Sequence, residues 1–204
     1  FMSDKNLLDN NPNALILITA FNEEGRINIV INQCKKYFSN IVVVDDGSTD
    51  KTWTEIIEAK PNYALKHCVN CGAGTAIRTG INFFLEKTKF KYLVTIDGDT
   101  QHKPSNALRM LNYTIENNLD VVLGSRFLNK NAIKYIPLRR RIILKCAILF
   151  EKFFYGINLS DSHNGMRVLC REACFEIKDL ESSSFAYCTE IPLKFKKSKF
   201  KIKE

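Results

Sequence analysis

The most constraining feature of this sequence is the repeated alternation of short apolar runs with amphipathic segments. Each run is rich in valine, isoleucine and leucine and has the length of a buried strand. The segments between the runs place apolar side chains three or four residues apart, as a helix that packs on a sheet does. The predicted strands are 15–18, 41–44, 63–69, 92–96 and 121–123, and the predicted helices lie around 27–34, 53–57, 76–84 and after Pro104. This alternation predicts an α/β fold with a mostly parallel, Rossmann-like sheet covered by helices on both faces.

Polar and charged side chains follow the predicted strands directly. They include Glu23, Asp45, Asp97, Asp99 and Arg126, together with the glycine-containing stretch 70–74. The carboxyl ends of parallel strands lie at one edge of a sheet, and open α/β sheets bind ligands there. This convergence indicates a nucleotide-type ligand.

The fourth predicted strand leads into Asp97-Gly98-Asp99. An isolated ionised carboxylate is costly to bury, so packing explains this pair poorly. Mg²⁺ or Mn²⁺ explains it better, because both ions prefer hard oxygen ligands and often hold a phosphate substrate. Gly98 would let backbone or ligand approach closely. For this motif taken alone, an Asx turn that closes a hairpin is the alternative.

Charge is unevenly distributed along the chain. Residues 1–119 contain 13 lysines and arginines and 13 acidic residues, whereas residues 120–204 contain 17 and 9, so the second part carries the whole net charge of +8. A basic second part suggests an anionic partner, which could be a phosphate, a membrane surface or nucleic acid.

Length and composition fit one globular domain with a sizeable core, since 45% of the 204 residues are hydrophobic and 25% are charged. Phe1 precedes Met2 and is treated as an added residue. We find no signal peptide and no run near the ~20 apolar residues of a membrane span, so we expect the protein to face the cytoplasm. The seven cysteines are expected to stay reduced and to pack as small apolar side chains, Cys68 and Cys71 included.

Five motifs occur in a diagnostic order. They are Thr-Ala-Phe-Asn-Glu (19–23), Val-Val-Asp-Asp-Gly-Ser-Thr-Asp (43–50), Asn-Cys-Gly-Ala-Gly-Thr-Ala-Ile-Arg-Thr-Gly (70–80), Asp-Gly-Asp-Thr-Gln-His (97–102) and Gly-Ser-Arg-Phe (124–127). Together they resemble the family 2 glycosyltransferases of the GT-A fold, nearest the dolichol- and polyprenyl-phosphate sugar synthases, over about residues 14–195. The resemblance implies an inverting, metal-dependent enzyme. It would move a sugar from a UDP- or GDP-linked donor to a polyprenyl phosphate or lipid-linked glycan, in the synthesis of cell-envelope polysaccharide or glycolipid.

The resemblance also assigns residues to the donor site. The nucleoside pocket would be lined by Thr19, Phe21, Glu23, Val43 and Asp45, with a place in the core as the alternative for Phe21. The metal ligands would be Asp97, Asp99 and Gln101, and Asp97, Gly98 and Gln101 would also lie against the donor. Arg126 would contact the departing diphosphate. Gly72 would bring its loop close to the donor.

Acceptor binding is assigned to the second half. The segment 160–167 resembles the family's D-x-x-x-G-[FL]-R motif, which makes Asp161 the candidate general base. A lipid phosphate is already ionised and needs no base, and Asp161 would then orient the acceptor or exclude water. His163 is an acceptor candidate with a structural role as its alternative. Arg167 would touch substrate or brace Asp161.

A basic, amphipathic helix is predicted over 136–155. Three arginines at 139–141 and a broad apolar face suit a helix that lies in the headgroup plane of a membrane. By position in the family, Arg140 would meet the acceptor phosphate. The enzyme would then be peripheral at the inner face of the cell membrane, held there by the membrane surface or by a small membrane partner protein. A core helix with a solvated basic end is the alternative.

These assignments divide the chain into an N-terminal tail (1–13), a donor half (14–127) and an acceptor half (128–204) that is shortened at its C-terminal end relative to the family.

A dinucleotide-dependent oxidoreductase is disfavoured, because Ile77 stands in place of the third glycine of its motif. A sugar-nucleotidyltransferase would need a glycine-rich loop where 19–23 stands. A non-enzymatic nucleic-acid-binding protein lacks support from any recognised module, so nucleic acid is not expected as a partner.

Overall fold

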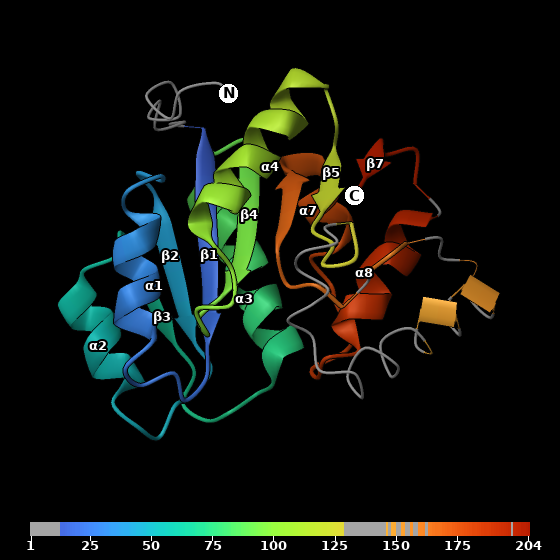
Figure 1. The fold of residues 1–204 in the computed structure, drawn as a ribbon. Coiled ribbons are helices and arrows are strands. Elements are labelled where there is room, and N and C mark those ends of the chain that lie inside the picture. The colour runs from blue at the N-terminus through green and yellow to red at the C-terminus, as the bar shows by residue number, and fades with distance from the viewer. Residues whose placement is uncertain are drawn as a thin grey trace.

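The computed structural model describes residues 13–128, 146, 148–149, 152–153, 156, 159–161, 163–196 and 198–204. Its centre is a seven-stranded sheet of order β3-β2-β1-β4-β6-β5-β7 (Figure 1). The strands are β1 (Ala14–Ala20), β2 (Ile41–Asp45), β3 (Tyr63–Lys66), β4 (Tyr92–Asp97), β5 (Val121–Leu123), β6 (Arg167–Cys170) and β7 (Ile202–Lys203). The helices are α1 (Ile27–Cys34), α2 (Thr52–Ala59), α3 (Ala73–Lys87), α4 (Pro104–Glu116), α7 (Arg171–Glu176) and α8 (Tyr187–Lys196).

The sheet is mostly parallel, as predicted. β1 pairs in parallel with β2 and β4, β2 with β3, and β5 with β7, while β6 runs antiparallel between β4 and β5. The five predicted strands are present, although the third ends at Lys66 rather than at residue 69. β6 and β7 were not predicted: β6 begins with the charged Arg167 and was interpreted as the end of the acceptor motif, and β7 has only two residues. The predicted donor and acceptor halves therefore contribute to one sheet, and the boundary between them stays a prediction.

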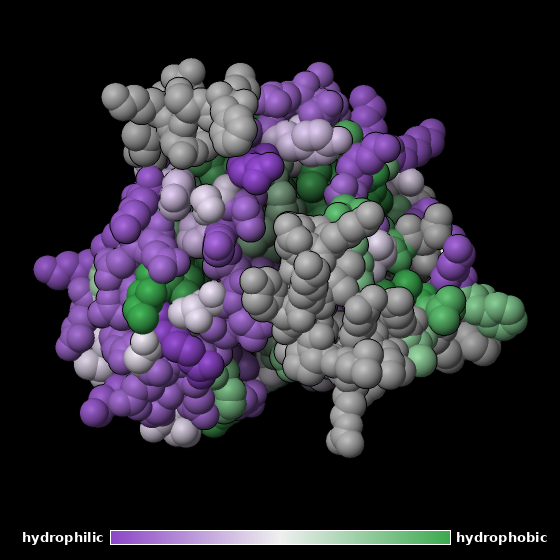
Figure 2. Space-filling model, in the orientation of Figure 1, coloured by the Kyte–Doolittle hydropathy of each residue, from purple (hydrophilic) through white to green (hydrophobic). Residues whose placement is uncertain are grey.

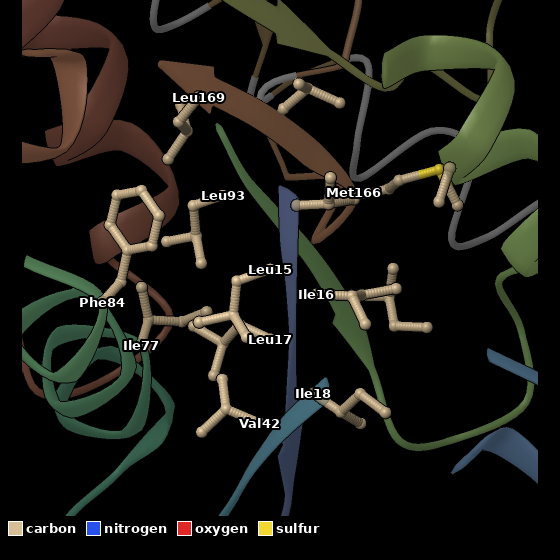
Figure 3. Packing of buried hydrophobic residues seen from close by; sticks show 14 of the residues in the cluster. Leu15, Ile16, Leu17, Ile18, Val42, Ile77, Phe84, Leu93, Met166 and Leu169 are labelled. Carbon is tan, nitrogen blue, oxygen red and sulfur yellow. The ribbon is translucent and has the colours of Figure 1, made fainter. Parts of the chain in front are cut away.

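Strand periodicity places apolar side chains on both faces of the sheet. Leu15 and Leu17 of β1 point toward Ile77 and Phe84 of α3, whereas Ile16 and Ile18 point to the opposite face (Figure 3). Because both faces of β1 are buried, both must be covered. Figure 1 shows α1 and α4 in front of the sheet and α3 behind it, so the predicted helical layers are confirmed.

One sequence expectation is corrected by exposure. Cys68 and Cys71 are exposed rather than packed, because β3 has already ended and both lie in the loop before α3. By contrast, Cys34, Cys170, Cys174 and Cys188 are buried as expected. Near the C-terminal end of the chain, Ile202 and Lys203 form the edge strand next to β5.

The antiparallel strand β6 brings a distant loop to the end of β4. Arg167 pairs in register with Thr95, and the Thr95 hydroxyl donates to the carbonyl of Gly165 at 2.7 Å. Residues 163–165 are thereby held beside Asp97, which ends β4. Most of the predicted helix 136–155, Arg140 included, lies outside the described residues.

Candidate active site

A cavity of about 590 Å³ lies at the carboxyl ends of β1, β2 and β4. The register explains why polar residues meet there, since Thr19 pairs with Asp97 and Ala20 with Asp45 across adjacent strands. The cavity is lined by Thr19, Ala20, Phe21, Glu23, Asp46, Asn70, Gly72, Ala73, Ala76, Asp97, Gly98, Asp99, Gln101, His102, Arg126, His163, Asn164, Gly165, Ser184, Phe185 and Tyr187. Ten residues predicted for the site are among them: Thr19, Phe21, Glu23, Gly72, Asp97, Gly98, Asp99, Gln101, Arg126 and His163.

Two residues predicted to line the nucleoside pocket do not line this cavity. Val43 is fully buried within β2. The Asp45 carboxylate is buried, and its Oδ1 accepts from the hydroxyl and the backbone N–H of Ser48. Its Oδ2 has no hydrogen-bond partner in the described part of the chain and lies 3.9 Å from Lys66 Nζ. Successive residues at a strand end point in opposite directions, and it is the next residue, Asp46, that lines the cavity.

Asp46 is held in place by three donors. Its Oδ1 lies 2.7 Å from His67 Nδ1 and accepts the Cys71 backbone N–H at 3.0 Å, while its Oδ2 accepts the Gly72 N–H at 2.8 Å. A carboxylate has about four acceptor positions. One position on Oδ2 is therefore left for a ligand.

Asp97 is positioned by His102 and by Gly165. His102 Nε2 lies 3.2 Å from its Oδ2, and Gly165 packs so closely that a Cβ there would lie 2.3 Å from the same oxygen. Burial opposes ionisation of Asp97, but the hydrogen bond from His102 and the charges of His102, Arg167 and Arg126 outweigh it and lower its pKa. Asp97 is therefore ionised at neutral pH.

Asp99 and Glu23 bring further negative charge to the cavity. Asp99 Oδ1 accepts the backbone N–H of Gln101 at 2.9 Å, and Thr100 between them takes the left-handed φ of +68°. Burial raises the pKa of Glu23, and the charges of Asp99, Asp50 and Asp97 add to this effect against the nearby Arg26. A cation bound between carboxylates that repel one another would offset this repulsion and stabilise their ionised forms.

The pair Asp97 and Asp99 fits a hard cation, since both side chains offer carboxylate oxygens. Among the described residues, no histidine, cysteine or further carboxylate completes a three-residue metal-binding group with Asp97 and Asp99. The remaining coordination positions of Mg²⁺ or Mn²⁺ would thus be filled by phosphate oxygens and water, which is how Mg²⁺ is commonly bound with phosphate substrates.

Asp161 forms an ion pair with Arg126 rather than facing the cavity. Its Oδ2 accepts the backbone N–H of Arg126 at 2.9 Å and Nε–H at 2.7 Å, and its Oδ1 accepts from Nη2 at 2.7 Å. The Asp161 side chain is 1% exposed and does not line the cavity, whereas Arg126 does. This two-pronged contact fixes the guanidinium and raises the pKa of Arg126. The geometry is that of a residue that positions Arg126.

Arg167 neither lines the cavity nor takes the place that we expected beside Asp161. Its side chain is buried with the guanidinium 5.1 Å from the ring centre of Tyr187, which does line the cavity. Both terminal nitrogens of Arg167 are buried without a hydrogen-bond partner. Its charge acts at longer range by lowering the pKa of Asp97.

The glycine loop packs against another backbone segment that reaches the cavity. The Gly74 N–H donates to the Ser183 carbonyl at 2.8 Å. A Cβ on Gly72 would lie 2.3 Å from the Ser183 carbonyl oxygen, and one on Gly74 only 1.9 Å from that of Ser182. These glycines thus permit the close approach of 182–184, although Gly72 also lines the cavity as predicted.

Several lining residues were missed from the sequence. Asp46 and His102 stand inside the quoted motifs and could have been found there, because both are potential ligands next to predicted site residues. Ser184, Phe185 and Tyr187 follow no motif, and only the packing of their segment on the glycine loop brings them to the cavity.

Comparison with known proteins agrees with this arrangement. A model of the family described as "Glycosyl transferase family 2" matches residues 15–177, which is most of the chain. The chain belongs to this family. It is therefore a glycosyltransferase, and the predicted enzyme class is confirmed.

Relatives of this glycosyltransferase include an uncharacterised protein of Methanocaldococcus jannaschii, 34% identical over 96% of this chain and 80% of the relative. A UDP-N-acetylglucosamine–dolichyl-phosphate N-acetylglucosaminyltransferase of Methanococcus voltae is 30% identical over 93% of this chain and 82% of the relative. Among solved structures, glucosyl-3-phosphoglycerate synthase of Mycobacterium tuberculosis with Mn²⁺, UDP and phosphoglyceric acid matches with a TM-score of 0.70. It is 16% identical, and the match covers 95% of this chain and 68% of that one. The fold of the glycosyltransferase is the predicted GT-A fold.

Proposed function

We propose that this glycosyltransferase moves a sugar from a nucleotide-sugar to a polyprenyl phosphate or lipid-linked glycan, with inversion at the anomeric carbon and with Mg²⁺ or Mn²⁺ held by Asp97 and Asp99. The observation that carries the proposal is the meeting of Glu23, Asp97 and Asp99 with Arg126 around one cavity. The acidic groups suit a cation, and the arginine suits a phosphate. Named relatives that act on dolichyl and polyprenyl phosphates support the acceptor class.

Uridine is the nucleoside that we propose for the donor. Thr19, Phe21 and Glu23 would contact it, and Asp46 takes the role first expected for Asp45. With Oδ1 occupied twice and Oδ2 once, Asp46 can accept one more N–H. Uracil presents a single ring N–H, whereas guanine presents adjacent ring and amino donors that would need both oxygens. We therefore expect UDP to bind more tightly than GDP.

The reaction would be a single displacement. An oxygen of the ionised acceptor phosphate would attack the anomeric carbon, and the bond from that carbon to the diphosphate oxygen would break. Arg126, fixed by Asp161, would stabilise the negative charge on the leaving diphosphate. A divalent cation, when bound, would add positive charge at the same leaving group. Because an ionised acceptor needs no base, Asp161 can remain paired with Arg126.

A place at the inner face of the membrane is supported by the second half of the chain. The described residues contain no helix that is both long and apolar enough to span a bilayer. Leu149 and Phe153 are 66% and 83% exposed. Figure 2 shows hydrophobic atoms at the right edge of the molecule, where the orange segment of Figure 1 lies. Together with arginines 139–141 and the proposed phosphate contact of Arg140, they suit attachment to an anionic surface.

Replacement of Asp99 tests the metal role. We expect Asp99→Ala to lower Mn²⁺- or Mg²⁺-dependent turnover of a UDP-sugar by about a hundredfold or more, because a ligand of the charge-stabilising cation is lost. Its unfolding temperature in EDTA should stay unchanged. Asp179→Ala is the matched control, since Asp179 is exposed and does not line the cavity. Turnover by Asp99→Ala at the normal rate in Mn²⁺ would refute the metal role.

A further inference from the structure

Three metal-ligating side chains meet beside the cavity at a place that the proposed reaction does not use for a metal. Asp46 follows β2, His67 follows β3 and Cys71 precedes α3. One ligand atom of each lies within 4.8 Å of those of the other two. The tertiary structure thus supplies what the pair Cys68 and Cys71 lacks in the sequence, namely ligands from other segments.

Hydrogen bonds hold these three residues close together. His67 Nδ1 faces Asp46 Oδ1 at 2.7 Å, and His67 Nε2 lies 2.9 Å from the Thr79 hydroxyl. A metal-bound histidine usually donates its other ring N–H to a nearby oxygen, and Thr79 on α3 offers that oxygen. The Gly72 N–H binds Oδ2 of Asp46, while Oδ1 accepts the Cys71 N–H and faces His67 Nδ1. A metal ion bound to Oδ1 and Nδ1 would take the place of the proton between these two atoms, and the ring N–H of His67 would then be on Nε2.

The ligand types select the ion. A thiolate, an imidazole and a carboxylate make a borderline-soft set that suits zinc, and three protein ligands leave a fourth position for water or another ligand. The pair Asp97 and Asp99 offers oxygen alone, which suits Mg²⁺ or Mn²⁺. We propose that Asp46, His67 and Cys71 form a three-ligand zinc site, distinct from the Asp97–Asp99 pair.

Direct metal binding tests this site without any donor or turnover. The reduced protein is titrated with Zn²⁺ against a chromophoric chelator, and separately with Co²⁺. We expect one tight Zn²⁺ per chain and a near-ultraviolet charge-transfer band from a Cys71 thiolate bound to Co²⁺. Cys71→Ser should abolish the band, His67→Gln should abolish tight Zn²⁺ binding, and Thr79→Val should weaken it by about ten- to a hundredfold.

Matched controls separate this site from other thiols. Cys68 and Cys146 are also exposed, so the double variant Cys68→Ser/Cys146→Ser should keep both the Zn²⁺ stoichiometry and the band. Unfolding temperatures in EDTA show whether each variant is folded. The absence of a stoichiometric site or of the band in the unaltered protein overturns the proposal whatever the variants do. So does equal loss in the Cys68/Cys146 variant.

One consequence rests on the proposed function. Asp46 Oδ2 is also the proposed acceptor for the nucleoside N–H, and Zn²⁺ bound to Oδ1 would withdraw negative charge from the same carboxylate, so bound Zn²⁺ should weaken UDP binding at least tenfold. The metal titrations use no nucleotide, so they test the zinc site alone, and the UDP measurements test the donor role of Asp46. UDP affinity that is unchanged by Zn²⁺ in a protein that binds the ion would contradict the donor role and leave the zinc site standing.

Discussion

Asp97 illustrates how much a single residue depends on a glycine far away in the chain. Its carboxylate occupies the space that a side chain at 165 would need, with 2.3 Å between a hypothetical Cβ and Oδ2. The Thr95 hydroxyl holds the Gly165 carbonyl in the same place. Gly165 therefore permits the position of the Asp97 carboxylate, while His102 orients it.

We expect Gly165→Ala to displace that carboxylate and to weaken activation by Mn²⁺ about tenfold or more, because small misplacements in a site are costly. Gly80→Ala is the control, since its Cβ would lie 2.3 Å from Leu17 in the core and should cost about 1–3 kcal/mol of stability without changing metal activation. Mn²⁺ activation curves and thermal unfolding of both variants measure this. An unaltered activation curve for Gly165→Ala would show that Asp97 tolerates the added methyl group.

Glu23 should make stability depend on pH in the metal-free protein. Its pKa is raised above 4.5, chiefly by burial and further by Asp99, Asp50 and Asp97. The folded protein then binds this proton more tightly than the unfolded chain does, so stability falls as pH rises through the raised pKa. In EDTA we expect Glu23→Gln to unfold at a higher temperature than the unaltered protein at neutral pH, with no difference below pH 4.5. Thermal unfolding across this range decides it, and a less stable variant at neutral pH would contradict the stated cause.

At the scale of elements, Arg171 at the start of α7, a helix that was not predicted, stabilises the C-terminal end of α3, a helix that was predicted. Arg171, where α7 begins, donates to the carbonyls of Leu85, Thr88 and Phe90 at 2.6, 2.8 and 2.9 Å. The last carbonyls of a helix lack partners within it, and α3 ends at Lys87. Arg171 thus ties the C-terminal end of α3 and the approach to β4 to the β6–α7 connection.

Arg171→Met should cost about 3 kcal/mol, because charged hydrogen bonds to these carbonyls are lost while much of the side-chain volume remains. For a chain of this size the unfolding temperature should fall by about 6–12 °C. Arg109→Met is the control, since Arg109 is exposed on α4. Thermal denaturation of both variants measures the difference. Equal unfolding temperatures would mean that Arg171 contributes little to the closure of α3.

For the molecule as a whole, the second half of the chain carries the whole net positive charge and also some of the exposed apolar side chains. The net charge of +8 comes from residues 120–204, and Leu149 and Phe153 are exposed there. An anionic surface attracts basic segments with about 1 kcal/mol per lysine or arginine close to it. Membrane binding would thus present the second half to the acceptor.

Replacing Arg139, Arg140 and Arg141 together by glutamine should weaken binding to phosphatidylserine-containing vesicles by about a hundredfold, since three such charges are lost. It should also raise the acceptor KM. The matched control changes Lys60, Lys87 and Lys89 to glutamine, which removes the same charge from exposed positions in the balanced first half. Vesicle co-sedimentation measures both variants. Equal weakening by both would make the effect one of net charge, and the interfacial role of the helix would fail.

The sequence by itself determined the parts of this protein that depend on neighbours along the chain. The strands β1, β2 and β4 and the helices that follow them show their periods in the local sequence. The polar residues of the site stand directly after these strands. Because parallel strands end at one edge, this local information was enough to place Asp97, Asp99 and Arg126 around one cavity.

Only the tertiary structure decided which groups meet across distant segments. Asp45 and Asp46 are neighbours of the same type, and the packing of the β2 end determines which of them reaches the cavity. The pairing of Asp161 with Arg126 and the meeting of His67 with Asp46 join residues 35 and 21 positions apart. Such contacts depend on strand order and loop packing, which no local period records, and they determine how this glycosyltransferase positions its charges.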